Sequence, residues 1–192
     1  GSFGVKQGVF PYMILAGVAA RIAGAPVKWI EDRLEHLSAS VSATNRQTRI
    51  EAAVEADGRI TALDWDQIED CGAHLRAPEP ATLYRMHGNM TGAYDIPNMA
   101  IRNRVVLTNK TPTGLNRGFG GPQGMVGIER VMDHMAHRLG MDPLEFRLRH
   151  AKSDKVRKAL EKVAEEGDWG RRMPQGMAQG IAIHQEYKGA TA

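Results

Sequence analysis

A glycine- and proline-rich stretch at residues 108–123 places the strongest constraint on how this chain can fold. It reads Thr-Asn-Lys-Thr-Pro-Thr-Gly-Leu-Asn-Arg-Gly-Phe-Gly-Gly-Pro-Gln, and most of these residue types favour turns. Residues 101–107 before it are strand-like. After it, an apolar stripe at helical spacing predicts a helix that ends at Gly140; the stripe is Met125, Ile128, Met132, Met135 and Leu139. A glycine loop therefore has to join a strand to a helix, and the free N–H groups of a helix start favour an anion.

The other predicted elements are a mixture of helices and strands. We expect helices over residues 10–23, 143–148 and 154–166, and strands over residues 27–30, 50–56, 60–69 and 180–184. Asp57-Gly58 between two of these strands predicts a hairpin, and Asp142 before Pro143 predicts a helix cap. Because the two types alternate irregularly, the predicted fold class is α+β (mixed α/β) rather than a doubly wound parallel sheet.

Composition excludes several classes of protein. Cys71 is the single cysteine among 192 residues, which excludes a disulfide framework and a four-cysteine metal centre within this chain. The most apolar stretch, residues 9–23, is interrupted by Pro11 and Arg21, so we expect no membrane span. Between Arg147 and Arg172 nine basic residues stand against five acidic ones, with Trp169 as the single Phe, Tyr or Trp among them, which predicts a solvated helix face rather than a nucleic-acid site.

A series of short motifs along residues 1–150 carries a family resemblance. They are Ser2-Phe3-Gly4-Val5-Lys6, Ala25-Pro26-Val27-Lys28-Trp29 with Asp32-Arg33, Asp57-Gly58-Arg59-Ile60, Gly92-Ala93-Tyr94-Asp95-Ile96-Pro97-Asn98, Asn116-Arg117-Gly118-Phe119-Gly120-Gly121-Pro122-Gln123, and Leu139-Gly140-Met141-Asp142-Pro143 with Asp133, Ala136 and Glu145-Phe146-Arg147. In this order they resemble the molybdopterin-binding large subunit of the xanthine dehydrogenase/aldehyde oxidase family, the molybdenum hydroxylases.

The resemblance implies two cofactor loops. Phe3 and Gly4 match a loop whose backbone lies beside the molybdenum, and Arg117 and Gly118 match a second loop that contacts the cofactor. The implied cofactor is a molybdopterin-type molybdenum cofactor or its cytosine dinucleotide form. Carbon monoxide dehydrogenases of this family carry a cysteine in the second loop, and its absence here disfavours copper–molybdenum chemistry.

Two further residues are implied to lie near the substrate. Gln7 falls where xanthine-oxidising members have a substrate-contacting glutamate, which disfavours a purine, and Phe119 matches an aromatic that stacks on a planar substrate. The implied reaction is the water-derived hydroxylation of an aldehyde or an N-heterocycle. No catalytic residue and no metal ligand are assigned within the chain, because the family's catalytic glutamate lies farther downstream.

The implied partners follow from what the chain lacks. Iron–sulfur clusters and flavin would lie on partner chains, and the remainder of the large subunit would complete the active site. We expect residues 1–150 to be the latter part of a first molybdopterin-binding domain, and residues 151–192 a linker helix and the incomplete start of a second. The chain would then be an enzyme fragment that is inactive alone. The alternative is a non-catalytic structural or interaction module that retains the fold without cofactor.

Other features of the sequence carry weaker expectations. We expect a cytoplasmic protein. The tail, residues 181–191 after Trp169-Gly170, is similar to isoquinoline-oxidoreductase-type members, and a protein of that type would instead be periplasmic. We expect Cys71 to be a small core residue. The acidic residues Asp64, Asp66, Glu69 and Asp70 are expected on one solvated strand face rather than at a calcium site.

Overall fold

The computed structural model describes residues 2–6, 8, 10–76, 89–118, 120–186 and 189–191. Its elements are α1 (Pro11–Ala23), α2 (Arg33–Ala39), β1 (Asn45–Val54), β2 (Ile60–Asp70), β3 (Met99–Val106), α4 (Gly121–Leu139), α5 (Pro143–Arg149), α6 (Asp154–Glu166), β4 (His184–Glu186) and β5 (Gly189–Thr191). This mixture confirms the predicted α+β class. The chain divides into two compact units: unit 1 is Gly1–Arg46, Glu69–Tyr84 and Val105–Gly120, and unit 2 is Gln47–Ile68, Arg85–Arg104 and Gly121–Ala192.

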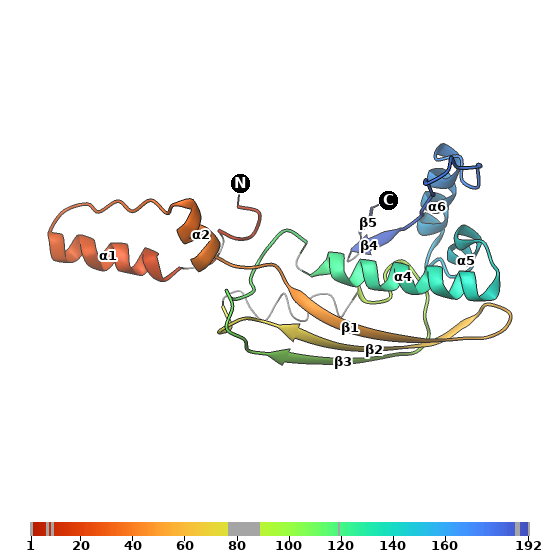
Figure 1. Ribbon diagram of the computed structural model, residues 1–192, viewed down its shortest axis with the longest axis horizontal. Helices are drawn as coiled ribbons and strands as arrows, with labels where there is room; N and C mark the ends of the chain where they lie inside the picture. Colours follow the sequence, from red (N-terminus) through yellow and green to blue (C-terminus); the bar gives the residue numbers. More distant parts are fainter. Residues whose placement is uncertain are drawn as a thin grey trace. The chain divides into compact units, whose positions relative to one another are not determined.

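The largest sheet has three strands in the order β1-β2-β3. The predicted hairpin is confirmed, since a turn at Gly58, with a φ of +89° that favours glycine, joins β1 to β2. β3 runs in the same direction as β2 (Figure 1). Two backbone hydrogen bonds show this pairing: the N–H of Leu63 donates to the carbonyl of Asn98 at 3.0 Å, and eight residues later in both strands the N–H of Cys71 donates to Val106 at 3.0 Å.

Helix α4 lies along one face of this sheet (Figure 1). The predicted apolar stripe faces inward, with Ile128, Met132 and Met135 buried. Gly127 lies where α4 comes closest to the sheet, and a Cβ added there would stand 2.5 Å from the indole ring of Trp65. A side chain cannot be accommodated at this distance, so the absence of one at residue 127 sets how closely α4 approaches the sheet.

Helices α5 and α6 complete the core of unit 2. As predicted, Asp142 caps α5, where its carboxylate accepts hydrogen bonds from the N–H groups of Leu144 and Glu145 at 2.9 and 3.1 Å. Helix α6 spans the predicted residues and buries two members of its apolar stripe, Val156 and Leu160.

A buried ionic network connects α4 and α5 to the segment before β3. Arg147 is fully buried; its Nε donates to Glu129 Oε2 at 2.9 Å, and its Nη2 lies 2.8 Å from Asp133 Oδ1. The buried hydroxyl of Tyr94 donates to Glu129 Oε1 at 2.6 Å. Burial raises the pKa of the Glu129 carboxyl, although the hydrogen bonds from Tyr94 and Arg147 act in the opposite direction. Arg147 therefore compensates a carboxylate whose desolvation would otherwise be costly.

The structure corrects two of the predicted elements. Residues 27–30 form no strand, and the chain instead enters α2, which begins with a capping box between Asp32 and Glu35. The final strand begins at His184 rather than at residue 180. Residues 180–183 are outside it, and the burial of Ile181 and Ile183 in the core explains their apolar sequence without strand pairing.

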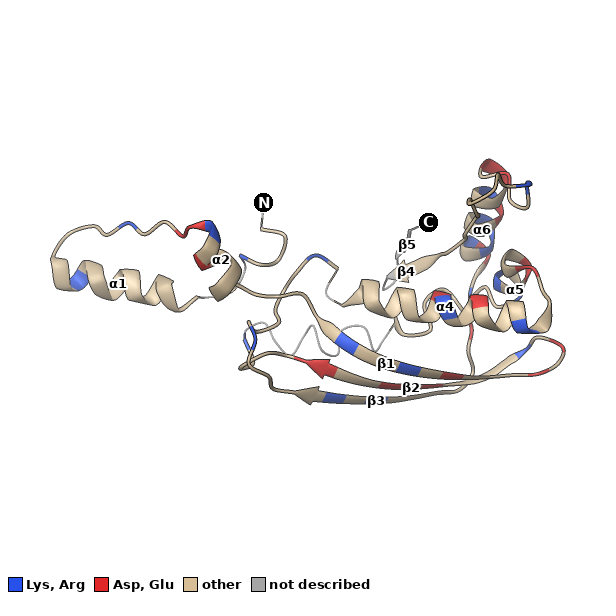
Figure 2. Cartoon of the chain, in the orientation of Figure 1, with Lys and Arg blue, Asp and Glu red and all other residues tan. Residues whose placement is uncertain are grey.

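Helix α1, like the short helix α2, buries none of its residues. It exposes Ile14, Leu15 and Ile22 at 62%, 64% and 83%, and Arg21 is its charged residue (Figure 2). Such a contiguous apolar surface is typical of a segment covered by another part of a larger protein. Within the described residues, no helix has the length and apolar character needed to cross a membrane.

Replacing Arg147 with Met should destabilise the protein by about 3–5 kcal/mol, because Glu129 would keep a buried charge without its cation. Without Arg147, the pKa of Glu129 in the folded state should rise further above that in the unfolded chain. A raised carboxyl pKa favours the folded state at low pH. The loss should therefore be largest near neutral pH and shrink as the pH falls toward about 4.3, the ordinary pKa of Glu. Chemical denaturation across this pH range measures the effect.

Arg149→Met is the matched control on the same helix. Arg149 pairs with Glu145 at 3.1 Å, but these side chains are 48% and 58% exposed. An exposed pair of this kind contributes little, so we expect a loss below about 1 kcal/mol. Equal losses in the two variants would contradict a special role for the buried network.

Candidate functional site

The first glycine loop, residues 2–6, belongs to unit 1 and bends at two adjacent positions. Phe3 and Gly4 have φ angles of +53° and +92°, and the N–H of Gly4 donates to Ser2 Oγ at 3.2 Å. The turn leaves the Phe3 side chain 61% exposed. The loop therefore presents an aromatic ring and a short run of bare backbone on the surface of unit 1.

The second loop, residues 113–118, is anchored at its start. Thr113 pairs with Ser42 in an isolated bridge, and Gly114 packs so closely on Val41 that an added Cβ would lie 2.5 Å from its Cγ1. Leu115 is buried, whereas Arg117 is exposed two residues later. The loop thus leaves a fixed base and reaches the surface at Arg117.

The structure brings the two predicted cofactor loops together. A Cβ added to Gly4 would lie 3.0 Å from the carbonyl carbon of Leu115 and 3.1 Å from its oxygen, so the loops are in van der Waals contact. Gly4 therefore contacts the second loop two residues before Arg117, although more than a hundred residues separate the two loops in sequence. The two residues predicted to lie near the substrate, Gln7 and Phe119, are outside the described residues.

This place suits a large anionic cofactor. No hydrogen bond or ion pair within the described part of the chain engages Arg117, so its guanidinium can bind phosphate oxygens in a bidentate manner. Gly118 has a φ of +95° and carries no side chain, which lets a ligand approach the backbone. The exposed ring of Phe3 adds an apolar surface. These residues fit a phosphate-bearing pterin.

The sequence motifs do not reveal two buried side chains close to the second loop, those of Arg46 and Glu69. Glu69 was expected on a solvated face, but it is fully buried, so that prediction was wrong. Its position shares the alternation of Leu63 and Trp65, which also face inward, and this register was the signal that could have revealed it. Glu69 forms an ion pair with Arg46, whose Nη1 also donates to the carbonyl of Gly120 at 3.1 Å.

Two other acidic residues of β2, Asp66 and Asp70, form polar contacts at the surface. Asp66 accepts hydrogen bonds from Arg102 and Arg104 at 3.1 and 2.6 Å, and Asp70 accepts one from Thr108 Oγ1 at 2.6 Å. Desolvation acts to raise the pKa of both carboxyls, but the hydrogen bonds and nearby cations outweigh it, and both pKa values lie below the usual range. Within the described residues, no group of three His, Cys, Asp or Glu side chains could hold a metal ion.

Cys71 lies in the interior of unit 1, as predicted. It is 1% exposed, and its Sγ donates to the carbonyl of Val106 at 3.2 Å. The thiol therefore packs as a small core residue at the end of β2 rather than in either glycine loop.

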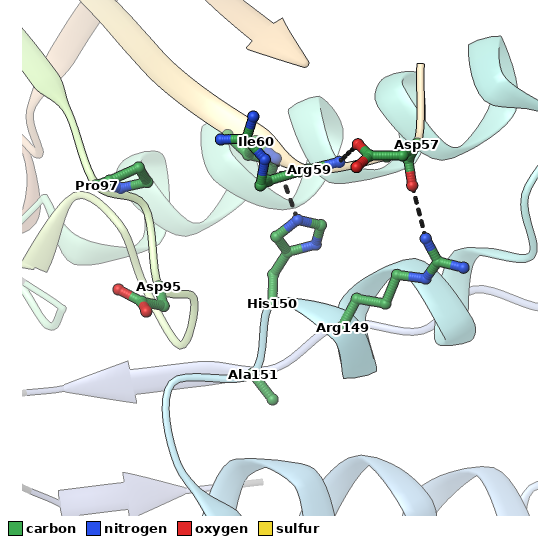
Figure 3. Close-up of a pocket in the computed structure, with 9 residues that line it drawn as sticks. Asp57, Arg59, Ile60, Asp95, Pro97, Arg149, His150 and Ala151 are labelled. Carbon is green, nitrogen blue, oxygen red and sulfur yellow. Dashed lines mark hydrogen bonds between the residues drawn. The ribbon is translucent and has the colours of Figure 1, made fainter. Parts of the chain in front are cut away.

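Unit 2 contains a separate cavity of about 500 Å³ near the hairpin turn (Figure 3). His150 lies in its wall, where Nε2 accepts a hydrogen bond from the N–H of Ile60 at 3.3 Å and Nδ1 donates to the carbonyl of Phe146 at 2.8 Å. Arg149 donates to the carbonyl of Asp57 at 2.7 Å. The side chains of His150 and Arg149 are already engaged in hydrogen bonds with the backbone of the chain, and no predicted site residue lines the cavity. The loops of unit 1 are therefore the better candidate for the functional site.

Comparison with known proteins decides the family. A family model described as the molybdopterin cofactor-binding domain matches residues 1–151. The chain belongs to this molybdopterin cofactor-binding family. The resemblance to the large subunits of molybdenum hydroxylases, and the molybdopterin-type cofactor that it implied, are thereby confirmed.

Relatives of this molybdopterin-binding chain are similar over most of its length. It is 37% identical over 150 residues to the gamma subunit of the 6-hydroxypseudooxynicotine dehydrogenase complex and 35% identical over 153 residues to the large subunit of nicotine 6-hydroxylase, both from Paenarthrobacter nicotinovorans. Each alignment covers 78% of this chain but 19% of the relative, so the chain spans about a fifth of their length.

A solved structure shows the same fold. Quinoline 2-oxidoreductase from Pseudomonas putida 86 superposes with a TM-score of 0.82 at 27% identity. The match covers 88% of this molybdopterin-binding chain and 24% of the other chain. The fold of this chain is thus that of part of a larger molybdopterin-binding subunit.

Replacing Gly4 with Ala should loosen the contact between the two loops, because the new Cβ would meet the Leu115 backbone and Ala is strained at a positive φ. Such strain typically costs about 1–3 kcal/mol. Hydrogen exchange measured by mass spectrometry should become faster over residues 113–118.

Gly17→Ala is the control, because Gly17 lies in α1 with no atom within 4 Å of an added Cβ. It should leave exchange over residues 113–118 unchanged and stabilise α1 by up to about 1 kcal/mol. Unchanged exchange in the Gly4 variant would show that the contact does not order the second loop.

Proposed function

We propose that this chain is part of the large subunit of a molybdenum hydroxylase that oxidises an aldehyde or an N-heterocycle with oxygen taken from water. The observation that supports the proposal is the packing of Gly4 on Leu115, a contact between the two loops that the family resemblance assigns to the cofactor, in a chain of the molybdopterin-binding family. The exposed guanidinium of Arg117 beside them supplies the charge that a phosphate-bearing cofactor needs.

Each loop has a distinct part in holding the cofactor. Arg117 would bind phosphate oxygens, while the backbones of Gly4 and Gly118 would allow close approach and Phe3 would shield one side from water. A bound molybdenum cofactor supplies Lewis acidity and two-electron redox chemistry. The role of these residues is to bind and orient it, since they include no group suited to general acid–base catalysis.

The proposed substrate is a flat, electron-poor molecule. Phe119 would stack on it, and Gln7, in place of an acidic side chain, disfavours a purine. The names of the relatives, nicotine 6-hydroxylase and quinoline 2-oxidoreductase, support an N-heterocycle as the substrate, and an aldehyde is the alternative substrate that the wider family supports. The loop from Asn116 to Gly120 has no cysteine, so a copper-dependent reaction is not proposed.

We further propose that other polypeptide segments complete the active site. The relatives are about four times as long as this chain, and α1 exposes an apolar surface that the remainder of a large subunit would cover. Residues 151–192 would begin a second molybdopterin-binding domain. Electrons would leave through an iron–sulfur partner and, in some complexes, a flavin partner, because Cys71 alone cannot ligate a cluster.

Metal and pterin analysis of the full-length subunit, purified with its partners, tests this function. The wild-type subunit should carry molybdenum and pterin. Arg117→Met should lower the molybdenum content about tenfold, since a hydrogen-bonded charge contact is worth roughly 1.5–3 kcal/mol. Arg130→Met, at an exposed position of α4, is the matched control and should retain the cofactor.

A wild-type subunit without molybdenum would contradict the proposed function and favour a structural module that retains the fold without cofactor. Equal molybdenum contents in the Arg117 variant and the wild type would contradict the assignment of this side chain alone.

A further inference from the structure

A buried ion pair lies directly beneath the second cofactor loop. Arg46 stands at the start of β1 and Glu69 near the end of β2, and their side chains are 3% and 0% exposed. Arg46 Nε donates to Glu69 Oε2. Both residues belong to unit 1, as do residues 105–120. Placing two charges in the interior is strongly unfavourable, and apolar residues of similar size often serve stability equally well. Stability alone therefore does not account for this pair.

The other edge of the guanidinium holds the loop backbone. Arg46 Nη1 donates to the carbonyl of Gly120 at 3.1 Å. Gly120 has a φ of +77°, and an added Cβ would lie 2.6 Å from Arg46 Nη2 and 2.9 Å from Cζ. The guanidinium is thus packed against Gly120, which lies between the second loop and the start of α4 at Gly121.

We infer that Arg46, oriented by Glu69, is a positioning residue that fixes the backbone at Gly120 and so orients Arg117 and Gly118 for cofactor binding. The inference rests on the proposed function, in which Arg117 and Gly118 contact the cofactor. Arg46 acts through the backbone: its hydrogen bond to the carbonyl holds Gly120, and Gly120 limits where Arg117 and Gly118, three and two residues earlier, can lie.

The geometry requires arginine. One planar guanidinium donates along Nε to the carboxylate and along Nη1 to the carbonyl, in two fixed directions. A lysine ammonium carries the same charge on a flexible stem and does not present this fork. The charge can therefore be kept while the positioning is lost, which separates an electrostatic role from a geometric one.

Two variants of the full-length subunit, purified with its partners, test the inference. R46K keeps the charge. The double variant R46M/E69M replaces the whole pair by apolar side chains, so it should melt at or above the wild-type temperature. In both variants we expect faster hydrogen exchange over residues 117–120 in cofactor-free protein and about a tenfold lower molybdenum content, the loss expected for one charge-assisted hydrogen bond.

R49K is the matched control, because Arg49 lies on the same strand and pairs with Glu51, and these side chains are 78% and 57% exposed. It should match the wild type in exchange and in molybdenum content. Wild-type exchange and molybdenum content in R46K or in the double variant would overturn the inference and leave the pair a purely structural feature. If the wild-type subunit itself contained no molybdenum, the proposed function would fail. The positioning role is tested separately, because unchanged hydrogen exchange over residues 117–120 in the R46K and R46M/E69M variants would refute it.

Discussion

The fold of unit 2 depends on the close approach of one helix to a sheet. Helix α4 can lie against Trp65 because residue 127 is a glycine, and any side chain there would push the helix away. At this distance Ile128 and Met132 reach the core, and Glu129 reaches both Tyr94 and Arg147. The ionic network and the apolar core are therefore two results of the same geometric requirement. Interior packing leaves little tolerance for such a displacement.

Much of this architecture could be predicted because its signals are local. The Asp57-Gly58 turn, the Asp142 cap and the apolar stripe of α4 each lie within a few neighbouring residues, and each was predicted correctly. The errors concern segments whose conformation depends on contacts with distant residues rather than on neighbouring ones. Residues 27–30 have strand-like side chains, but none of the described strands pairs with them, and Ile181 and Ile183 are apolar because they enter the core.

The site was predicted less completely than the fold. The motifs identified the loops at Gly4 and Gly118, but several of the residues that carried the resemblance, Tyr94 and Arg147 among them, proved to be structural members of the core. The pair of Arg46 with Glu69 could not be predicted, since the partners lie on different strands and their meeting depends on the strand register. Alternation along β2 could still have shown that Glu69 points inward.

The parallel pairing of β2 with β3 has a consequence for how quickly the sheet can assemble. The hairpin of β1 and β2 closes over a few residues, whereas the contact of Leu63 with Asn98 must close a loop of more than thirty residues. Loop closure costs more entropy as the loop lengthens, and non-local pairings fold more slowly than local ones. The third strand should therefore join a hairpin that already exists, and until it does the edge of β2 remains open to pairing with other chains.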